Sequence, residues 1–303
     1  MTPQTIDAAD SGSWTLGDLT VNRIGFGAMR LPQTGEALTA GAVPRDRATA
    51  ISVLRRAVEL GVNHIDTAAF YFSPLRSANE LINRALAPYP DDLVVATKVG
   101  PGRDLSGRWA PHATTPEQLR GQVEENLRQL GRDHLDVVNL RVVGTGSIAE
   151  RFGGLAELRR AGLVRHLGLS NVTPAHLAEA QAIAPVVCVQ NMYGIGVRPE
   201  HDAFLRACGE QGIAFVPFYS IAGAGGEAGT TGAESGELLA VARAHGASAA
   251  QIRLAWTLRR GPHVLAIPGT GDPRHLAANV AAGALRLSDD ELALLDSLHR
   301  REA

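Results

Sequence analysis

The sequence predicts an α/β fold, a (β/α)8 TIM barrel with an N-terminal β-hairpin and long loops at its C-terminal face. Eight short runs rich in apolar and β-branched residues recur along the 303-residue chain. Helical patterns separate these runs, which is typical of a parallel sheet. The runs are continuously apolar, as expected of strands that are buried on both faces. On this pattern alone, a doubly wound open sheet is the alternative.

The predicted strands and helices alternate along the chain. The strands are expected at 23–29, 62–66, 93–97, 136–140, 165–170, 186–190, 214–218 and 264–268. Helical patterns lie at 47–61, 77–86, 115–131, 156–162, 173–183 and 235–246, with a further helix near the end of 267–280. Several of these helices begin with Ser or Thr, which cap helix N-termini, and several end in Gly, which is favoured just past a helix.

Three segments lie outside the repeat of strands and helices. They are a predicted hairpin at 13–21 around Gly17-Asp18, a long loop at 100–113, and a Gly-rich loop at 221–236. Both long loops follow the carboxyl end of a strand, where barrel enzymes build their sites. The Gly-rich loop fits either a cover over a pyrophosphate or simple flexibility. We find no domain boundary and expect 1–303 to be a single domain, with 1–12 as a disordered arm.

Composition excludes several classes of function. Charged residues make up 20% of the chain and the net charge is −2, so we expect no nucleic-acid or anionic-membrane partner. No run of about 18 apolar residues occurs, which predicts no transmembrane helix. The polar, acidic N-terminus is unlike a secretory signal, and the expected compartment is the cytoplasm. Cys188 and Cys208 are expected to be buried thiols. We predict no metal site, and a monomer or weak homo-oligomer.

Polar residues follow the ends of five predicted strands. They are Asp66, Lys98, Arg141, Ser170 with Asn171, and Gln190 with Asn191. In a barrel, these strand ends converge on one mouth. Any one of them could be polar only because strand ends meet water. A carboxylate, an ammonium, a guanidinium and amides at five such ends favour a functional site.

Tyr71 follows Asp66 by five residues in the segment IDTAAFY. Reduction of a carbonyl needs a proton donor at the oxygen as hydride reaches the carbon. Tyrosine has an ordinary pKa of about 10, which a nearby ammonium lowers. We therefore predict that Tyr71 is the general acid, that Lys98 tunes it, and that Asp66 orients Lys98. The alternatives are a packed aromatic residue and a solvated lysine.

These residues stand in segments that resemble the aldo-keto reductase family. The segments are IDTAAFY, ATKVG, LDVVNLR, LRRAGLVRHLGLSNV, VCVQN, and IPGT followed by HLAAN, and the resemblance spans residues 14 to about 298. It implies a barrel with NAD(P)H across its mouth that reduces an aldehyde or ketone, and it assigns Tyr71 as the proton donor. Within the family, the chain is similar to a bacterial subgroup that includes pyridoxal reductases, so pyridoxal and similar aromatic aldehydes are implied as substrates.

Arg141 departs from the family's pattern, which has a histidine immediately after the leucine at the end of strand four. That histidine helps to orient the substrate carbonyl. Arginine is always charged and presents several donors in a fixed fork. Arg141 is therefore predicted either to hydrogen-bond the carbonyl and lower the pKa of Tyr71, or to hold an anionic group of the substrate. A salt bridge inside the barrel mouth is the structural alternative.

The nicotinamide end of the cofactor is expected to lie near strands five to seven. No GxGxxG motif stands between a strand and a helix, so a Rossmann-type site is not predicted. By resemblance, Ser170, Asn171 and Gln190 would hold the nicotinamide carboxamide. Phe218 takes the place of the family's stacking tyrosine, and the adjacent Tyr219 is a rival aromatic face.

The phosphate end of the cofactor is expected at the last strand. A phosphate there would meet backbone N–H groups at a helix N-terminus, where Gly269 allows close approach and Thr270 offers a hydroxyl. By resemblance, His275 and the adjacent Arg274 replace basic residues that contact a 2′-phosphate, which favours NADPH over NADH. The predicted cofactor-binding residues at the ends of the first and eighth strands are Gly27, Ala28, Gly269, Thr270, Arg274, His275 and Asn279.

Two other functions stay open on the sequence. The first is a non-catalytic nicotinamide-binding regulatory barrel, although intact Asp66, Tyr71 and Lys98 argue against it. The second is a barrel lyase or isomerase that works through a Schiff base at Lys98. His64 precedes Asp66 by two residues and shares its strand face, where a packed histidine is expected rather than a catalytic one.

Overall fold

The computed structural model describes residues 6–35, 37–39, 41–104, 106–221 and 234–301. Within these residues, seven parallel strands form one curled sheet in the order β15-β14-β13-β12-β9-β6-β3. The strands are β3 (Phe26–Gly27), β6 (His64–Asp66), β9 (Val94–Val99), β12 (Leu135–Arg141), β13 (Val164–Ser170), β14 (Val186–Gln190) and β15 (Ala214–Phe215).

The eighth predicted strand closes the sheet into a barrel, but it does so through isolated bridges. Val264 bridges to Phe215 on β15, and Ala266 bridges to Ile24 beside β3, both in parallel. Backbone N–H groups of Leu265 and Ala266 donate to the carbonyls on either side. The (β/α)8 architecture is therefore confirmed, with its last strand reduced to a few bonds.

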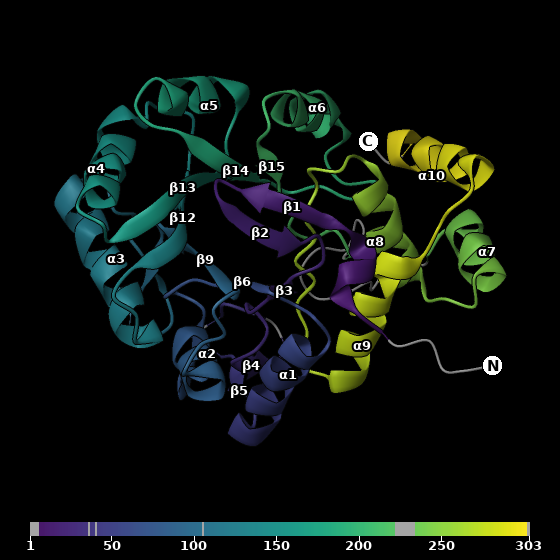
Figure 1. The fold of residues 1–303 in the computed structure, drawn as a ribbon, viewed down its shortest axis with the longest axis horizontal. Helices are drawn as coiled ribbons and strands as arrows, with labels where there is room; N and C mark the ends of the chain where they lie inside the picture. The colour runs from purple at the N-terminus through teal and green to yellow at the C-terminus, as the bar shows by residue number, and fades with distance from the viewer. Residues whose placement is uncertain (1–5, 36, 40, 105, 222–233, 302–303) are drawn as a thin grey trace.

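Ten helices in the described residues surround the sheet as an outer ring (Figure 1). They are α1 (Arg47–Glu59), α2 (Ala78–Leu86), α3 (Pro116–Leu130), α4 (Ala149–Arg160), α5 (Pro174–Gln181), α6 (Asp202–Glu210), α7 (Gly236–Ala244), α8 (Ala249–Arg259), α9 (Pro273–Ala281) and α10 (Asp289–Arg301). Thr115, Thr173 and Ser248 form capping boxes at α3, α5 and α8. Thr115 and Thr173 thus start helices that the sequence predicts, whereas the helix that Ser248 starts is not among the predicted ranges. Helix α4 begins at Ala149 rather than at 156.

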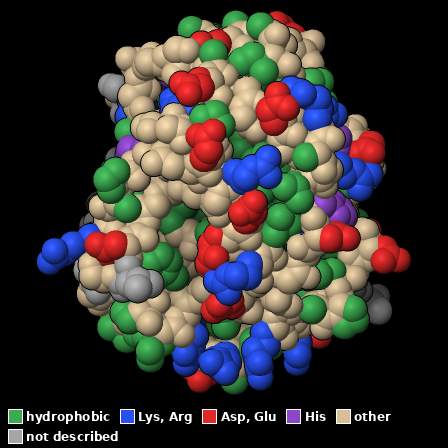
Figure 2. Space-filling model, turned by 90° about the vertical axis from the view of Figure 1, so that its left-hand side faces the viewer, with side chains coloured by type: hydrophobic (Ala, Val, Ile, Leu, Met, Phe, Trp, Pro, Cys, Tyr) green, Lys and Arg blue, Asp and Glu red, His purple; other side chains and the backbone are tan. Residues whose placement is uncertain are grey.

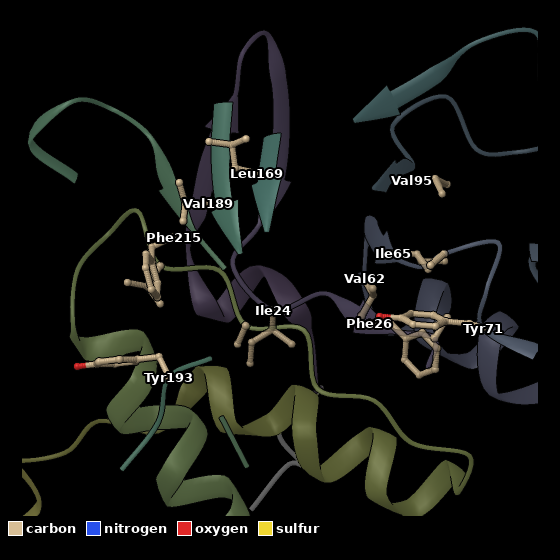
Figure 3. Close-up of a cluster of buried hydrophobic side chains, with 14 of the residues drawn as sticks. Ile24, Phe26, Val62, Ile65, Tyr71, Val95, Leu169, Val189, Tyr193 and Phe215 are labelled. Atoms are coloured by element: carbon tan, nitrogen blue, oxygen red, sulfur yellow. The ribbon is translucent and has the colours of Figure 1, made fainter. Parts of the chain in front are cut away.

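Successive residues of each strand face opposite sides of the sheet, and both sides are apolar. Ile24, Ile65, Val95, Leu169 and Phe215 are fully buried in the main hydrophobic cluster (Figure 3). A second cluster of buried side chains fills the barrel interior; its members include Val94, Val137, Cys188, Ala214 and Leu265. Two-sided burial explains why the strands read as continuous apolar runs.

The predicted hairpin covers the amino end of the barrel. Strands β1 (Ser13–Leu16) and β2 (Leu19–Asn22) pair in antiparallel register and lie across the centre of the ring in Figure 1. Leu16 and Val21 belong to the same buried cluster as Val94, near the start of a barrel strand. The hairpin therefore closes this end of the barrel interior.

Two segments differ from expectation or lie outside the described residues. Within the predicted disordered arm, residues 6–12 are ordered: Ala8–Ser11 form a 3-10 helix capped by Asp7, and the N–H of Ala8 donates to the carbonyl of Leu60 at 2.8 Å. This local cap was not apparent from composition. Residues 1–5, and residues 222–233 of the Gly-rich loop, lie outside the described part of the chain.

The outer surface carries mixed charge. Figure 2 shows acidic and basic side chains interspersed over one face. Ion pairs of this kind include Arg120–Glu124 on α3 and Arg160–Glu157 on α4. Across the described residues, every helix is too short or too polar to cross a membrane.

Substitution by alanine should lower the unfolding free energy at Gly25 and raise it at Gly121. A Cβ at Gly25 would overlap the fully buried imidazole of His64, whereas a Cβ at Gly121 in α3 meets nothing. Gly25→Ala should therefore cost about 1–3 kcal/mol of unfolding free energy, while Gly121→Ala should add about 0.5–1 kcal/mol. Urea unfolding followed by circular dichroism checks both. Equal midpoints for the two variants would contradict the packing of Gly25 on His64.

Candidate active site

A buried ion pair joins the carboxyl ends of two neighbouring strands. Lys98 Nζ at the end of β9 lies 2.6 Å from Asp66 Oδ1 at the end of β6, and both side chains are almost fully buried. The ammonium also donates to the carbonyl of Thr67 at 3.1 Å. Gln190 Nε2, on β14, donates to the other carboxylate oxygen of Asp66 at 2.8 Å. A charge out of water needs such a full set of partners.

Tyr71 completes the cluster. Its ring centroid lies 4.9 Å from Lys98 Nζ, and the side chain is 7% exposed. The phenol, the amine and the carboxylate, which come from three chain segments, therefore meet at one point. The Phe70 ring packs edge-on against Tyr71 with centroids 5.1 Å apart.

The environment sets the protonation of these groups. Burial raises the pKa of Tyr71, and this outweighs the opposing attraction of the Lys98 ammonium. Burial lowers the pKa of Lys98, but the charge of the Asp66 carboxylate and the hydrogen bond to it act in the opposite direction, and the net effect is to raise this pKa. The prediction that Lys98 brings the pKa of Tyr71 below its ordinary value is therefore wrong, because burial raises that pKa by more than Lys98 lowers it. At neutral pH the phenol is protonated and the amine is charged.

A buried network of hydrogen bonds holds the residues that follow Asp66 and precede Lys98 in the chain. Thr67 Oγ1 donates to Asn79 Oδ1 at 2.7 Å, and Asn79 Nδ2 donates to Asn126 Oδ1 at 2.9 Å. Thr97 Oγ1 donates to the same Asn126 oxygen at 2.6 Å. Thr67 and Thr97 are the chain neighbours of Asp66 and Lys98. The sequence analysis missed the two asparagines because they lie inside α2 and α3, far from any strand end.

Arg141 ends β12, the strand that pairs directly with β9, which carries Lys98. Its Nη1 donates to Ser170 Oγ at 3.2 Å, and its Cζ lies 5.2 Å from the centroid of the Phe218 ring. Among the described residues, no carboxylate lies within ion-pair distance of Arg141. The salt bridge considered for Arg141 in the sequence analysis is therefore absent from the described residues. Its guanidinium group lines the cavity instead.

A cavity of about 580 Å³ opens beside these groups at the carboxyl mouth. Of the residues predicted from sequence, those that line it are Gly27, Asp66, Tyr71, Lys98, Arg141, Gln190, Phe218, Tyr219, Gly269, Thr270 and His275. The predicted residues that do not line it are Ala28, Ser170, Asn171, Arg274 and Asn279. Arg274 is largely exposed and pairs with Asp272 at 3.1 Å. Asn171 Nδ2 donates to the carbonyl of Val142 at 2.9 Å.

Two glycines bring backbone segments into contact at the cavity wall. A Cβ on Gly27 would lie 2.5 Å from the carbonyl oxygen of Ile267, and a Cβ on Gly269 would lie 2.6 Å from that of Gly27. Only glycine allows the ends of the first and eighth strand segments to approach so closely.

The connection 28–46 between β3 and α1 also lines the cavity, and the sequence analysis did not identify it. It contributes Met29, Arg30, Leu38 and Arg45. Arg45 Nη1 donates to the carbonyl of Gly271 at 3.2 Å, which ties this connection to the segment before α9. The sequence did offer one indication of its role: a connection this long between a strand and the next helix is unusual and is often functional.

A closed barrel with a protonated phenol beside a buried ammonium at its carboxyl mouth defines a class, that of barrel oxidoreductases acting on carbonyl compounds. The chain belongs to the aldo/keto reductase family, whose model matches residues 23–300. The family predicted from the sequence, and with it the class of oxidoreductase, is confirmed.

Similar proteins cover almost the whole chain. The chain is 46% identical to the pyridoxine 4-dehydrogenase of Escherichia coli over 297 residues. The aligned region covers 96% of this chain and 99% of that protein. A thermostable aldo-keto reductase solved with the inhibitor epalrestat is 29% identical, with a TM-score of 0.77 and coverage of 94% and 99%. An aldo-keto reductase from Klebsiella pneumoniae solved with NADPH is 25% identical, with a TM-score of 0.79 and coverage of 95% and 94%.

Removal of the carboxylate alone should destabilise the protein more than removal of the whole pair. Asp66→Leu leaves the Lys98 ammonium buried and uncompensated, which should cost about 3–5 kcal/mol, whereas Asp66→Leu with Lys98→Met removes both charges and should cost less. Urea unfolding of the wild type, both single variants and the double variant measures the coupling. A double variant less stable than Asp66→Leu would contradict it.

Proposed function

We propose that this protein reduces an aldehyde to the alcohol with NADPH, and that Tyr71 donates the proton to the carbonyl oxygen. When bound, NADPH supplies the hydride. The observation that carries the proposal is the cluster of Tyr71, Lys98 and Asp66 at the cavity. The phenol holds its proton at neutral pH, and the adjacent ammonium stabilises the phenolate that is left once the proton moves to the substrate oxygen.

The chain's own residues fit the nicotinamide end of the cofactor. Gln190 Oε1 is buried without a hydrogen-bond partner in the described residues, and an amide N–H is the donor that it lacks. Phe218 offers an aromatic face at the cavity. The Arg141 guanidinium lies over the Phe218 ring and donates a hydrogen bond to Ser170 Oγ. A nicotinamide ring that stacked on this face of Phe218 would therefore displace the guanidinium.

The opposite end of the cavity fits phosphate. Gly269, Thr270 and Gly271 line it just before α9, where the helix dipole favours an anion, although the Asp272 carboxylate lines the same stretch and caps the helix through the N–H of Arg274. Arg45 adds positive charge beside Gly271. This extra charge supports NADPH over NADH, as does the NADPH complex of the Klebsiella pneumoniae relative.

The substrate that we propose is a flat aromatic aldehyde of the pyridoxal type. Five aromatic side chains line the cavity: Phe70, Tyr71, Trp109, Phe218 and Tyr219. The Trp109 ring is tilted on Phe70 at a centroid distance of 5.9 Å and is 52% exposed, so one face stays open to stack on a ligand. The name of the Escherichia coli relative supports the same class of substrate.

The Schiff-base alternative conflicts with the environment of Lys98. An amine must be neutral to attack a carbonyl, whereas the Asp66 carboxylate raises the pKa of Lys98 and keeps it charged. The regulatory alternative predicts binding of NADPH without turnover. An aldehyde screen with purified protein therefore separates it from the enzyme that we propose.

Tyr71→Phe should bind NADPH as the wild type does and lose about 10²–10⁴-fold in kcat, because the proton donor is removed. Fluorescence titration gives the affinity, and absorbance at the NADPH band gives turnover of pyridoxal. Tyr89→Phe is the matched control, since the Tyr89 ring also lies 4.9 Å from a cation, Arg132, but away from the cavity. Full activity of Tyr71→Phe would remove its assigned role.

Arg141→His should change substrate preference rather than abolish turnover. Because Arg141 has no acidic partner among the described residues, we expect it to bind an anionic substituent of the substrate. The loss in kcat/KM should reach about 10- to 100-fold for 4-carboxybenzaldehyde, as for a charge-assisted hydrogen bond, and be small for 4-nitrobenzaldehyde. Equal changes for the two aldehydes would show that Arg141 does not select for charge.

A further inference from the structure

Arg103 binds the backbone on both sides of Tyr71. The residue lies on β10 (Gly102–Arg103), in the loop after β9. Its Nη1 donates to the carbonyl of Phe72 at 2.7 Å and to that of Phe70 at 3.3 Å. Its guanidinium carbon also lies 4.5 Å from the centroid of the Phe72 ring. One planar group therefore contacts both chain neighbours of the proposed proton donor.

The remaining N–H groups of Arg103 bind two further segments. Nε donates to the carbonyl of Gly107 at 3.0 Å, and Nη2 donates to that of Thr39 at 3.2 Å. Within the described residues, no carboxylate lies within ion-pair distance of the guanidinium. All of its hydrogen bonds thus go to backbone carbonyls, and they join three loops at the mouth of the barrel.

The segment that carries Tyr71 needs such an anchor because it is not part of the barrel sheet. Tyr71 follows β6 and precedes β7 (Phe72–Ser73). Its own backbone makes two local bonds, from its N–H to the carbonyl of Ala68 at 3.0 Å and from the N–H of Ala78 to its carbonyl at 2.8 Å. Lys98 and Asp66, in contrast, are fixed by strands. A proton donor misplaced by about 1 Å can cost about 100-fold in rate.

We propose that Arg103 is a positioning residue for the reduction: it fixes the backbone at 70–72 so that the Tyr71 hydroxyl meets the substrate oxygen beside Lys98. The inference rests on the proposed function, in which Tyr71 is the proton donor. Arg103 is not among the residues that line the cavity, so it acts through Tyr71 and not on the substrate. Lysine would not replace it, because one ammonium cannot also reach the carbonyls that Nε and Nη2 bind, and it lacks the planar face that lies over Phe72.

The test compares Arg103→Ala and Arg103→Lys with the wild type. We expect both variants to lower kcat for pyridoxal, about 10- to 100-fold for Arg103→Ala, while the Kd for NADPH changes less than about twofold. Guanidinium chloride at about 20–50 mM should restore part of kcat in Arg103→Ala, since the free ion can occupy the vacated position. Sodium chloride at the same ionic strength should not.

Arg23→Ala is the matched control. The Arg23 guanidinium also binds four backbone carbonyls, those of Ser11, Leu258, Gly261 and Val264, at the opposite end of the barrel. Its loss should lower the unfolding midpoint and leave kcat of the folded protein unchanged. A purely structural role for Arg103 would give that same result.

The outcomes separate this inference from the proposed function. Wild-type kcat in Arg103→Ala, or a loss that guanidinium does not reverse, overturns the positioning role if Tyr71→Phe is inactive in the same assay. If Arg103→Ala does not fold, full activity of folded Arg103→Lys overturns it. An active Tyr71→Phe instead refutes the proposed function itself.

Discussion

The buried pair of Lys98 and Asp66 is the constraint on which the rest of the site depends. An ammonium and a carboxylate lose their water in this position, and the protein must replace it with oriented partners. The carbonyl of Thr67 and the amide of Gln190 complete the set. The ends of three strands, β6, β9 and β14, therefore have to arrive at one point, which a closed ring of parallel strands achieves.

The strands and the loops contribute different precision to the site. Asp66, Lys98 and Gln190 are held by the ladder of the sheet, whose register leaves little freedom. Tyr71 lies on a connection in which the carbonyls of its neighbours, Phe70 and Phe72, would otherwise have to be satisfied by water. The hydrogen bonds from Arg103 replace that water and give a loop residue some of the rigidity of a strand.

The sequence predicts the parts of the molecule that follow local rules. Continuous apolar runs identify buried parallel strands, and polar residues at their ends identify the mouth, so Asp66, Lys98 and Gln190 could be found without coordinates. Contacts between segments distant in the chain could not be found in this way. Asn79 and Asn126 look like ordinary helix residues in the sequence. The hydrogen bonds from Arg103 to the carbonyls of Thr39 and Phe70 follow no strand or helix periodicity that the sequence would reveal. The ordered turn at Ala8–Ser11 likewise depends on contacts with distant segments, such as the bond from Ala8 N–H to the Leu60 carbonyl and that from Ile24 N–H to Ser11 Oγ.

In the reduction that we propose, the opposing influences on Tyr71 explain how one residue can both keep and release a proton. Burial favours the neutral phenol, and Lys98 favours the phenolate. In the resting site burial dominates, so the proton is present when an aldehyde arrives. In the proposed step, charge that develops on the substrate oxygen draws this proton away, and the phenolate that forms lies beside an ammonium already fixed by Asp66. Because that ammonium is oriented before the reaction, its stabilisation needs no rearrangement when the charge appears.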